Sequence, residues 1–154
     1  MMKYSTQNNW MQHTLSGIIN KTMEEQFITF ETAKLAKEKG FDVETTYNYY
    51  FDETIGSSNS KQNWNSSTTE LYSRPTQALL QRWLRKIHKI NVESNYLSNI
   101  QKYRTLFKPM SIIPKTFKNR TEYGLAVDKY YSKTSHDTYE DALEEGLYKA
   151  LKLI

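Results

Sequence analysis

The stretch RPTQALLQRWLRKIHKI, residues 74–90, carries the clearest structural signal in the sequence. Its large apolar residues Leu80, Trp83, Leu84 and Ile87 follow the i, i+3, i+4, i+7 spacing of one helix face. Pro75 suits a first helical turn, where the missing N–H has no intrahelical partner to lose. The sequence therefore predicts a helix over about 75–89 with one face in a core.

Two more helices are predicted on either side of this one. In ITFETAKLAKEKG, residues 28–40, Thr29 is placed to cap the N-terminus and Gly40 to end the helix. In TYEDALEEGLYKALKLI, residues 138–154, Thr138 is the expected N-cap. Gly146 lies next to the apolar face of that last helix and favours close approach of another backbone. That face is formed by Leu143, Leu147, Ala150, Leu151 and Ile154.

Strands are predicted from β-branched and aromatic runs between the helices. Residues 43–52 read as a strand, and Thr69–Tyr72 as a short return strand paired with it. The polar stretch between them, 56–69, is expected to be a flexible loop. Three further β-like runs are Asn91–Leu97, Met110–Phe117, which Pro114 interrupts, and Glu122–Tyr131.

These elements predict an α+β protein with the order α-β-β-α-β-β-β-α. We expect one small domain over residues 23–154, with three helices packed on a mostly antiparallel sheet. Residues 1–22, rich in Gln, Asn, Thr and Ser, are expected to be a poorly ordered N-terminal extension.

Composition excludes several classes of chemistry. The 154 residues include no Cys, so disulfides and thiolate metal sites are ruled out. The three histidines show no metal-ligand spacing, and the five glycines are too far apart for a phosphate-binding or dinucleotide loop. No catalytic motif is present, and we expect a non-enzymatic protein without metal or cofactor. No apolar run approaches the roughly 20 residues of a membrane span, so we expect a cytoplasmic protein.

Charge is distributed unevenly along the chain. Residues 74–120 contain eleven Lys and Arg and a single acid, Glu93, for a net charge of +10. The whole chain is +4, so the remainder carries −6. Cations on the predicted central helix repeat the i, i+3, i+4, i+7 spacing on the side opposite its apolar face. The candidate anion-binding residues are Arg82, Arg85, Lys86 and Lys89 on this helix, with Lys102 and Arg104 after it.

Such a cationic stripe attracts a polyanion and releases its counterions, which favours nucleic acid or an anionic nucleotide as partner. Nearby tyrosines, among them Tyr96 and Tyr103, could stack on bases if they face outward. The alternative is an ordinary solvated helix face, neutralised by the acidic last helix or by a second copy of the chain. The opposite charges also suit a protein partner or a homo-oligomer.

Trp64 stands alone among polar residues in KQNWNSS. An exposed Trp in a loop is a typical partner contact, whereas a Trp folded back onto its own domain is the structural alternative.

Three segments together resemble a group of short uncharacterised proteins of phages and mobile elements of anaerobic gut bacteria. They are ITFETAKLAKEKGF (28–41), RPTQALLQRWLRKIHKI (74–90) and TYEDALEEGLYKALKLI (138–154). The resemblance implies a phage origin and a place in the infected host cytoplasm or the virion. No activity or residue role comes with it.

From Arg74 onward, the predicted order helix, three strands, helix also resembles a double-stranded-RNA-binding domain. That family places lysines at the start of its last helix, where this chain has Glu140, Asp141, Glu144 and Glu145. The departure argues against duplex RNA binding in that manner.

The leading hypothesis is a non-enzymatic, phage-type accessory protein that binds nucleic acid or a nucleotide through its basic helix. The alternative is an interaction or assembly component, either a self-associating virion part or an inhibitor of a host defence protein.

Overall fold

A computed structural model describes residues 25–67, 70–111 and 118–154, and its fold is α+β, as predicted. The described part of the chain holds four α-helices rather than the expected three. The elements in chain order are α2 (Phe30–Glu38), β1 (Thr45–Tyr50), β2 (Ile55–Gln62), the 3-10 turn η1 (Trp64–Ser66), β3 (Leu71–Ser73), α3 (Gln77–Trp83), the π-helical turn η2 (Leu84–His88), β4 (Ile90–Leu97), β5 (Lys102–Pro109), α4 (Arg120–Asp128) and α5 (Tyr139–Leu151). The predicted extension at 1–22 lies outside the described residues.

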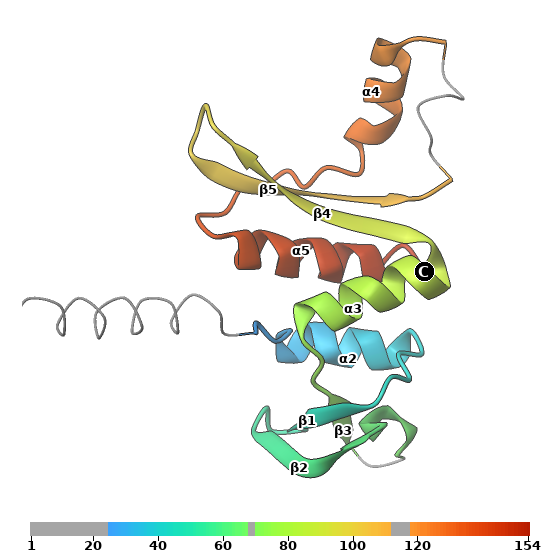
Figure 1. The fold of residues 1–154 in the computed structure, drawn as a ribbon, viewed down its shortest axis with the longest axis vertical. Helices are drawn as coiled ribbons and strands as arrows, with labels where there is room; N and C mark the ends of the chain where they lie inside the picture. The colour runs from blue at the N-terminus through green and yellow to red at the C-terminus, as the bar shows by residue number, and fades with distance from the viewer. Residues whose placement is uncertain (1–24, 68–69, 112–117) are drawn as a thin grey trace, which may run out of the picture.

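The strands form two antiparallel sheets instead of one. Strands β2, β1 and β3 make a three-stranded sheet in that order, and β4 with β5 makes a hairpin. Figure 1 shows α2, α3 and α5 between the hairpin and the three-stranded sheet, while α4 projects away from this stack. One cluster of buried side chains joins the layers, with Ile28, Leu84, Val92 and Leu147 each at most 1% exposed.

Helix α2 confirms the prediction for residues 28–40. The Thr29 hydroxyl accepts the Thr32 N–H at 3.3 Å, and Gly40 adopts φ +81°, the left-handed conformation that ends many helices. Its basic end is tied to the three-stranded sheet, because the Lys37 ammonium donates to the Leu71 carbonyl at 2.8 Å.

The first predicted strand is confirmed as β1, and it pairs with the return strand β3. The flexible loop predicted at 56–69 is wrong for its first half, because residues 55–62 form β2 and pair with β1. The turn between them is closed by Asp52, which accepts both the backbone N–H and the hydroxyl of Thr54. Pairing with β1 outweighs the weak strand propensity of Gly, Ser and Asn in this segment.

The predicted central helix is confirmed in its first part only. Helix α3 begins after the N-cap Thr76 and gives way at Leu84 to a π-helical turn, which ends at Lys89 with φ 57°. A π turn takes more residues per turn than an α turn, so the i, i+3, i+4, i+7 pattern loses its register. Trp83 and Leu84 are buried as predicted, whereas Ile87 is 63% exposed and does not belong to the core.

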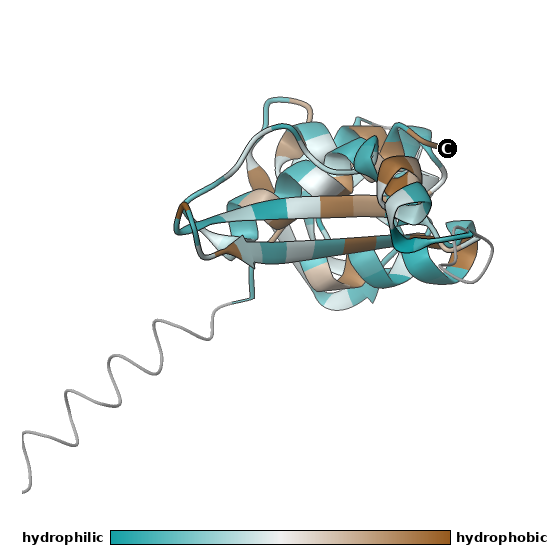
Figure 2. Ribbon diagram, turned by 90° about the horizontal axis from the view of Figure 1, so that it is seen from above, coloured by the Kyte–Doolittle hydropathy of each residue, from teal (hydrophilic) through white to brown (hydrophobic). Residues whose placement is uncertain are grey.

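The predicted strand at 91–97 is confirmed as β4, but its partner β5 was not foreseen from the sequence. Three consecutive residues of β5, Thr105, Leu106 and Phe107, are buried, and the strand packs against α5. Figure 2 views the hairpin from above and shows hydrophilic and hydrophobic residues interspersed along both strands. The positive charges of Lys102, Arg104 and Lys108 concealed this strand in the sequence.

The strand predicted at 122–131 is wrong, because residues 120–128 form helix α4. Asn119 caps it by accepting the Glu122 N–H at 2.8 Å, and Leu, Ala, Glu and Arg are good helix formers. In the described residues, two strands and not three therefore lie between the helix after Arg74 and the next helix. Most of the predicted run Met110–Phe117 lies outside the described residues.

Helix α5 confirms the last predicted helix and packs on the hairpin. The Thr138 hydroxyl accepts the Asp141 N–H at 3.1 Å, and Leu143, Leu147 and Leu151 are buried. Gly146 faces the side chains of Thr105 and Val92, so its close neighbours are strand side chains and not the backbone that the sequence predicts. No helix in the described ranges is both long and apolar enough to cross a bilayer.

Candidate anion-binding groove

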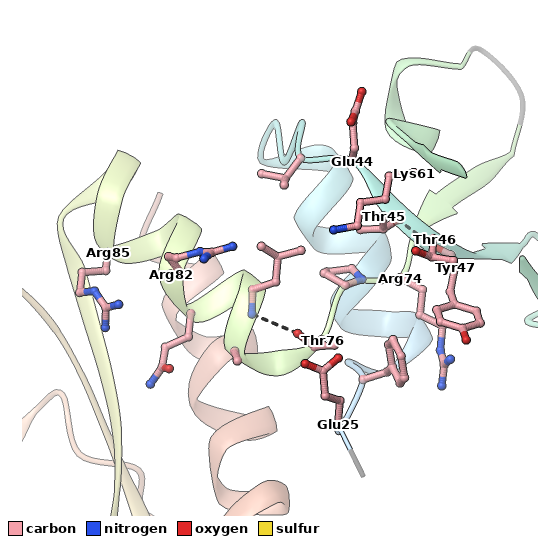
Figure 3. A pocket seen from close by; sticks show the side chains of 16 residues that line it. Glu25, Glu44, Thr45, Thr46, Tyr47, Lys61, Arg74, Thr76, Arg82 and Arg85 are labelled. Atoms are coloured by element: carbon pink, nitrogen blue, oxygen red, sulfur yellow. Dashed lines mark hydrogen bonds between the residues drawn. The ribbon is translucent and has the colours of Figure 1, made fainter. Parts of the chain in front are cut away.

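A groove of about 570 Å³ lies between α3 and the three-stranded sheet. Four cationic side chains line it, from β2, from the residue before Pro75 and from the end of α3 with the π turn that follows. Two acidic residues, Glu25 and Glu44, also line it. In Figure 3, Arg85 and Arg82 lie at one end, Lys61 lies near the middle, and Arg74 lies with Tyr47 at the other end.

An irregularity in β2 brings Lys61 to this groove. The register between β1 and β2 shifts, so that Thr45 pairs with Gln62 and Tyr47 with Ser57. Residues 58–61 of β2 therefore lie opposite the single residue Thr46 of β1. A bulge of this kind re-aims side chains at the edge of a sheet.

Arg74 is held by aromatic rings. Its guanidinium lies 4.2 Å from the ring centre of Phe27 and 5.2 Å from that of Tyr49. Its backbone N–H donates to the Tyr47 carbonyl at 3.0 Å, which joins the start of α3 to β1. Stacking on rings fixes the side chain without neutralising its charge.

Arg82 and Arg85 lie on the exposed side of α3 and η2, as the sequence predicts. Within the described ranges, neither forms an ion pair, and the same holds for Lys61 and Arg74. Lys86 and Lys89 are exposed as well but do not line the groove. Their positions make them a useful comparison for any test of the groove.

Lys102 and Arg104, the other predicted anion-binding residues, lie apart from the groove on β5. Lys102 pairs with Leu97 next to the turn of the hairpin. The opposite end of the hairpin, at Ile90, is the one that adjoins η2 and the groove. The Lys102 ammonium is 2.9 Å from the Asp137 carboxylate, and the Arg104 guanidinium stacks on Tyr131 at 4.7 Å.

Lys61 and Arg74 were not among the predicted site residues. Lys61 gave no usable signal, because its position depends on the β2 bulge. Arg74 offered one, since its place directly before Pro75 at a helix start was visible in the sequence.

Trp64, the predicted partner contact, packs against its own sheet. Its indole N–H donates to the Thr45 carbonyl at 3.0 Å, and the side chain is half-buried. Its neighbour Asn65 donates to the Phe41 carbonyl and accepts the Ser73 N–H, both at 2.8 Å. These hydrogen bonds give Trp64 and Asn65 a structural role, because they join the η1 turn to the three-stranded sheet.

A second hollow, of about 450 Å³, lies between α2 and α5 and has the opposite charge. Glu31, Asp141, Glu144 and Glu145 line it together with His136. In the ranges that the structure describes, no group of three such side chains is arranged to hold a metal ion.

The Glu145 carboxylate is held by hydrogen bonds from neighbouring side chains. Burial disfavours its charged form, but hydrogen bonds from Lys149, Ser132, Thr134 and His136 together outweigh burial and lower its pKa to about 2. The His136 Nε2 atom lies 2.9 Å from this carboxylate. Glu145 is therefore a structural anion, already saturated with donors.

No family model, curated protein or solved structure matches the chain. The resemblances to phage proteins and to a double-stranded-RNA-binding domain therefore remain predictions.

Proposed function

We propose that this protein is a non-enzymatic binding protein that holds a phosphate-bearing partner, nucleic acid or a nucleotide, in the groove beside α3. The observation that carries the proposal is that four cations, Lys61, Arg74, Arg82 and Arg85, line one hollow. Among the described residues, none of these four forms an ion pair with a carboxylate. Arginine and lysine so placed suit phosphate oxygens.

The cationic surface extends beyond the groove, because Lys86 and Lys89 are exposed on the same helical segment. A surface longer than one phosphate site favours a polymer over a small anion, since each neutralised phosphate adds a salt-dependent contribution. The phage resemblance predicts that this binding takes place in an infected bacterial cell.

The test is fluorescence anisotropy of labelled DNA and RNA, at salt concentrations from about 50 to 200 mM. Arg82→Glu/Arg85→Glu removes two groove cations, and Lys86→Glu/Lys89→Glu makes the same charge change just outside the groove. We expect the first variant to lose at least about tenfold in affinity, and its salt slope to fall by roughly 1.4 for two lost contacts to a single strand.

The second variant should lose less, because Lys86 and Lys89 meet phosphates beyond the groove, where the strand is open to solvent and charge interactions are screened. Equal losses in both variants would show that binding depends on diffuse charge and not on the groove. Absence of binding at the lowest salt concentration would overturn the proposal.

A second candidate function is self-assembly, which the acidic hollow between α2 and α5 favours. Its carboxylates are complementary in charge to the cationic groove, so one copy could receive the next in a head-to-tail contact. Light scattering should then show an oligomer that dissociates in salt. Arg82→Glu/Arg85→Glu should fail to assemble alone and recover when mixed with Glu31→Lys/Asp141→Lys.

A further inference from the structure

The groove has two chemically different parts. Four cations line it, and half-buried Val43 and Leu79 add apolar surface. Tyr47, which is 38% exposed, lines the end away from Arg85. An inorganic anion would pair only with the cations and leave the apolar part in water.

Tyr47 is held in a fixed orientation and keeps accessible surface. Its ring meets Phe27 edge-to-face, with centroids 5.1 Å apart and an interplanar angle of 78°. Phe27 in turn lies against the Arg74 guanidinium. An aromatic ring that is braced in this way and partly exposed is a suitable platform for a flat ring of a ligand.

A flat ring and a phosphate on one ligand are the two parts of a nucleotide. Lys61 lies between the Tyr47 end and the Arg82 end of the groove in Figure 3, so a phosphate next to a base on Tyr47 would lie within the cationic part. The volume of about 570 Å³ falls in the usual range for a site that holds a small molecule.

We infer that the groove receives an unpaired nucleotide of a single strand, with its base on Tyr47 and its phosphates between Lys61 and Arg82. Bases in a duplex are paired and stacked on one another and present no free face to a tyrosine. The cations Lys86 and Lys89 beyond the groove favour a strand over a free nucleotide. The inference rests on the proposed function and adds the class of nucleic acid and the role of Tyr47.

The experiment compares three labelled probes of equal length: a single strand, its duplex, and a single strand with abasic sites that keeps every phosphate. The wild-type protein should bind the normal strand roughly 5-fold to 150-fold more tightly than the abasic strand, the range that stacking on one aromatic side chain supplies. This comparison needs no variant and so does not depend on how a substitution affects folding.

Tyr47→Ala should bring the affinity for the normal strand down to that for the abasic strand and leave the latter unchanged. Tyr50→Ala is the matched control, because Tyr50 is on the same strand, is 45% exposed and does not line the groove. Tyr47→Phe should keep the preference for the normal strand.

Equal binding of normal and abasic strands, with both lost in Arg82→Glu/Arg85→Glu, would overturn the inference and leave the proposed function standing. Binding of none of the probes at about 50 mM salt would overturn both. A free nucleotide that displaces the strand at a similar concentration would overturn the assignment to a single strand.

Discussion

Gly146 of α5 lies so close to Thr105 of β5 that a Cβ atom on Gly146 would be 2.1 Å from the Thr105 Cγ2 methyl. The Thr105 hydroxyl also donates to the Ala142 carbonyl, one turn earlier on the same helix. Helix and hairpin therefore meet through backbone on one side and a small branched side chain on the other. A side chain at position 146 would force the Thr105 side chain, or one of these two elements, to shift.

Gly146→Ala should destabilise the protein by about 1–3 kcal/mol, the usual cost of overpacking a core, although Ala favours helix formation. Gly124→Ala is the control, because that glycine lies in α4 with nothing within 4 Å of the added Cβ, and it should be neutral or stabilising by up to about 1 kcal/mol. Thr105→Ser removes the clashing methyl group, so adding it to Gly146→Ala should recover part of the lost stability. Urea unfolding measures all three, and equal stability of the two alanine variants would contradict the packing described.

Because of the π turn, the apolar residues Leu84 and Ile87 should contribute unequally to the free energy of unfolding. Leu84 is fully buried, so Leu84→Ala should cost about 2–5 kcal/mol. Ile87 is 63% exposed, so Ile87→Ser should change stability by less than about 0.5 kcal/mol. Denaturant unfolding of the two variants decides the matter. A large loss of stability in Ile87→Ser would contradict the π turn and support the regular helix that the sequence predicts.

Asn65 should contribute more to stability than other polar residues of its segment. Its side chain bonds to Phe41 and Ser73, so Asn65→Ala leaves a carbonyl and an N–H without partners, at a cost of roughly 1–3 kcal/mol. Asn59 is exposed on β2, and Asn59→Ala should be close to neutral. Thermal unfolding followed by circular dichroism compares the two, and equal melting temperatures would contradict the role of Asn65.

The sequence predicted those elements whose determinants are local. Helices α2 and α5 have capping threonines and one-sided apolar faces, and both caps form the expected hydrogen bonds. Strand β2 and the π turn depend instead on contacts made elsewhere, the first on pairing with β1 and the second on packing and on Lys89 in a left-handed conformation. In β4 and β5, pairing joins a predicted strand to one that the charge pattern concealed.

The same division applies to the groove. Arg82 and Arg85 are three residues apart on one exposed face, and a periodic pattern sufficed to identify them. Lys61 reaches the groove only through the β2 bulge, and Arg74 owes its orientation to Phe27 and Tyr49. Tertiary contacts that bring distant segments together leave no periodic trace in a single sequence.

Glu145 predicts how stability depends on pH. Its folded pKa of about 2 lies below the ordinary value of 4.5, so ionised Glu145 stabilises the fold fully above about pH 5, and this stabilisation is lost as the pH falls toward 2. The loss should be on the order of 3 kcal/mol, since one pKa unit corresponds to about 1.4 kcal/mol. Glu145→Gln should be less stable at neutral pH and lose less stability between pH 5 and pH 2, as urea unfolding at each pH would show. Glu140→Gln controls for the loss of one charge on the same helix. Parallel stability curves for the wild type and Glu145→Gln would contradict this assignment.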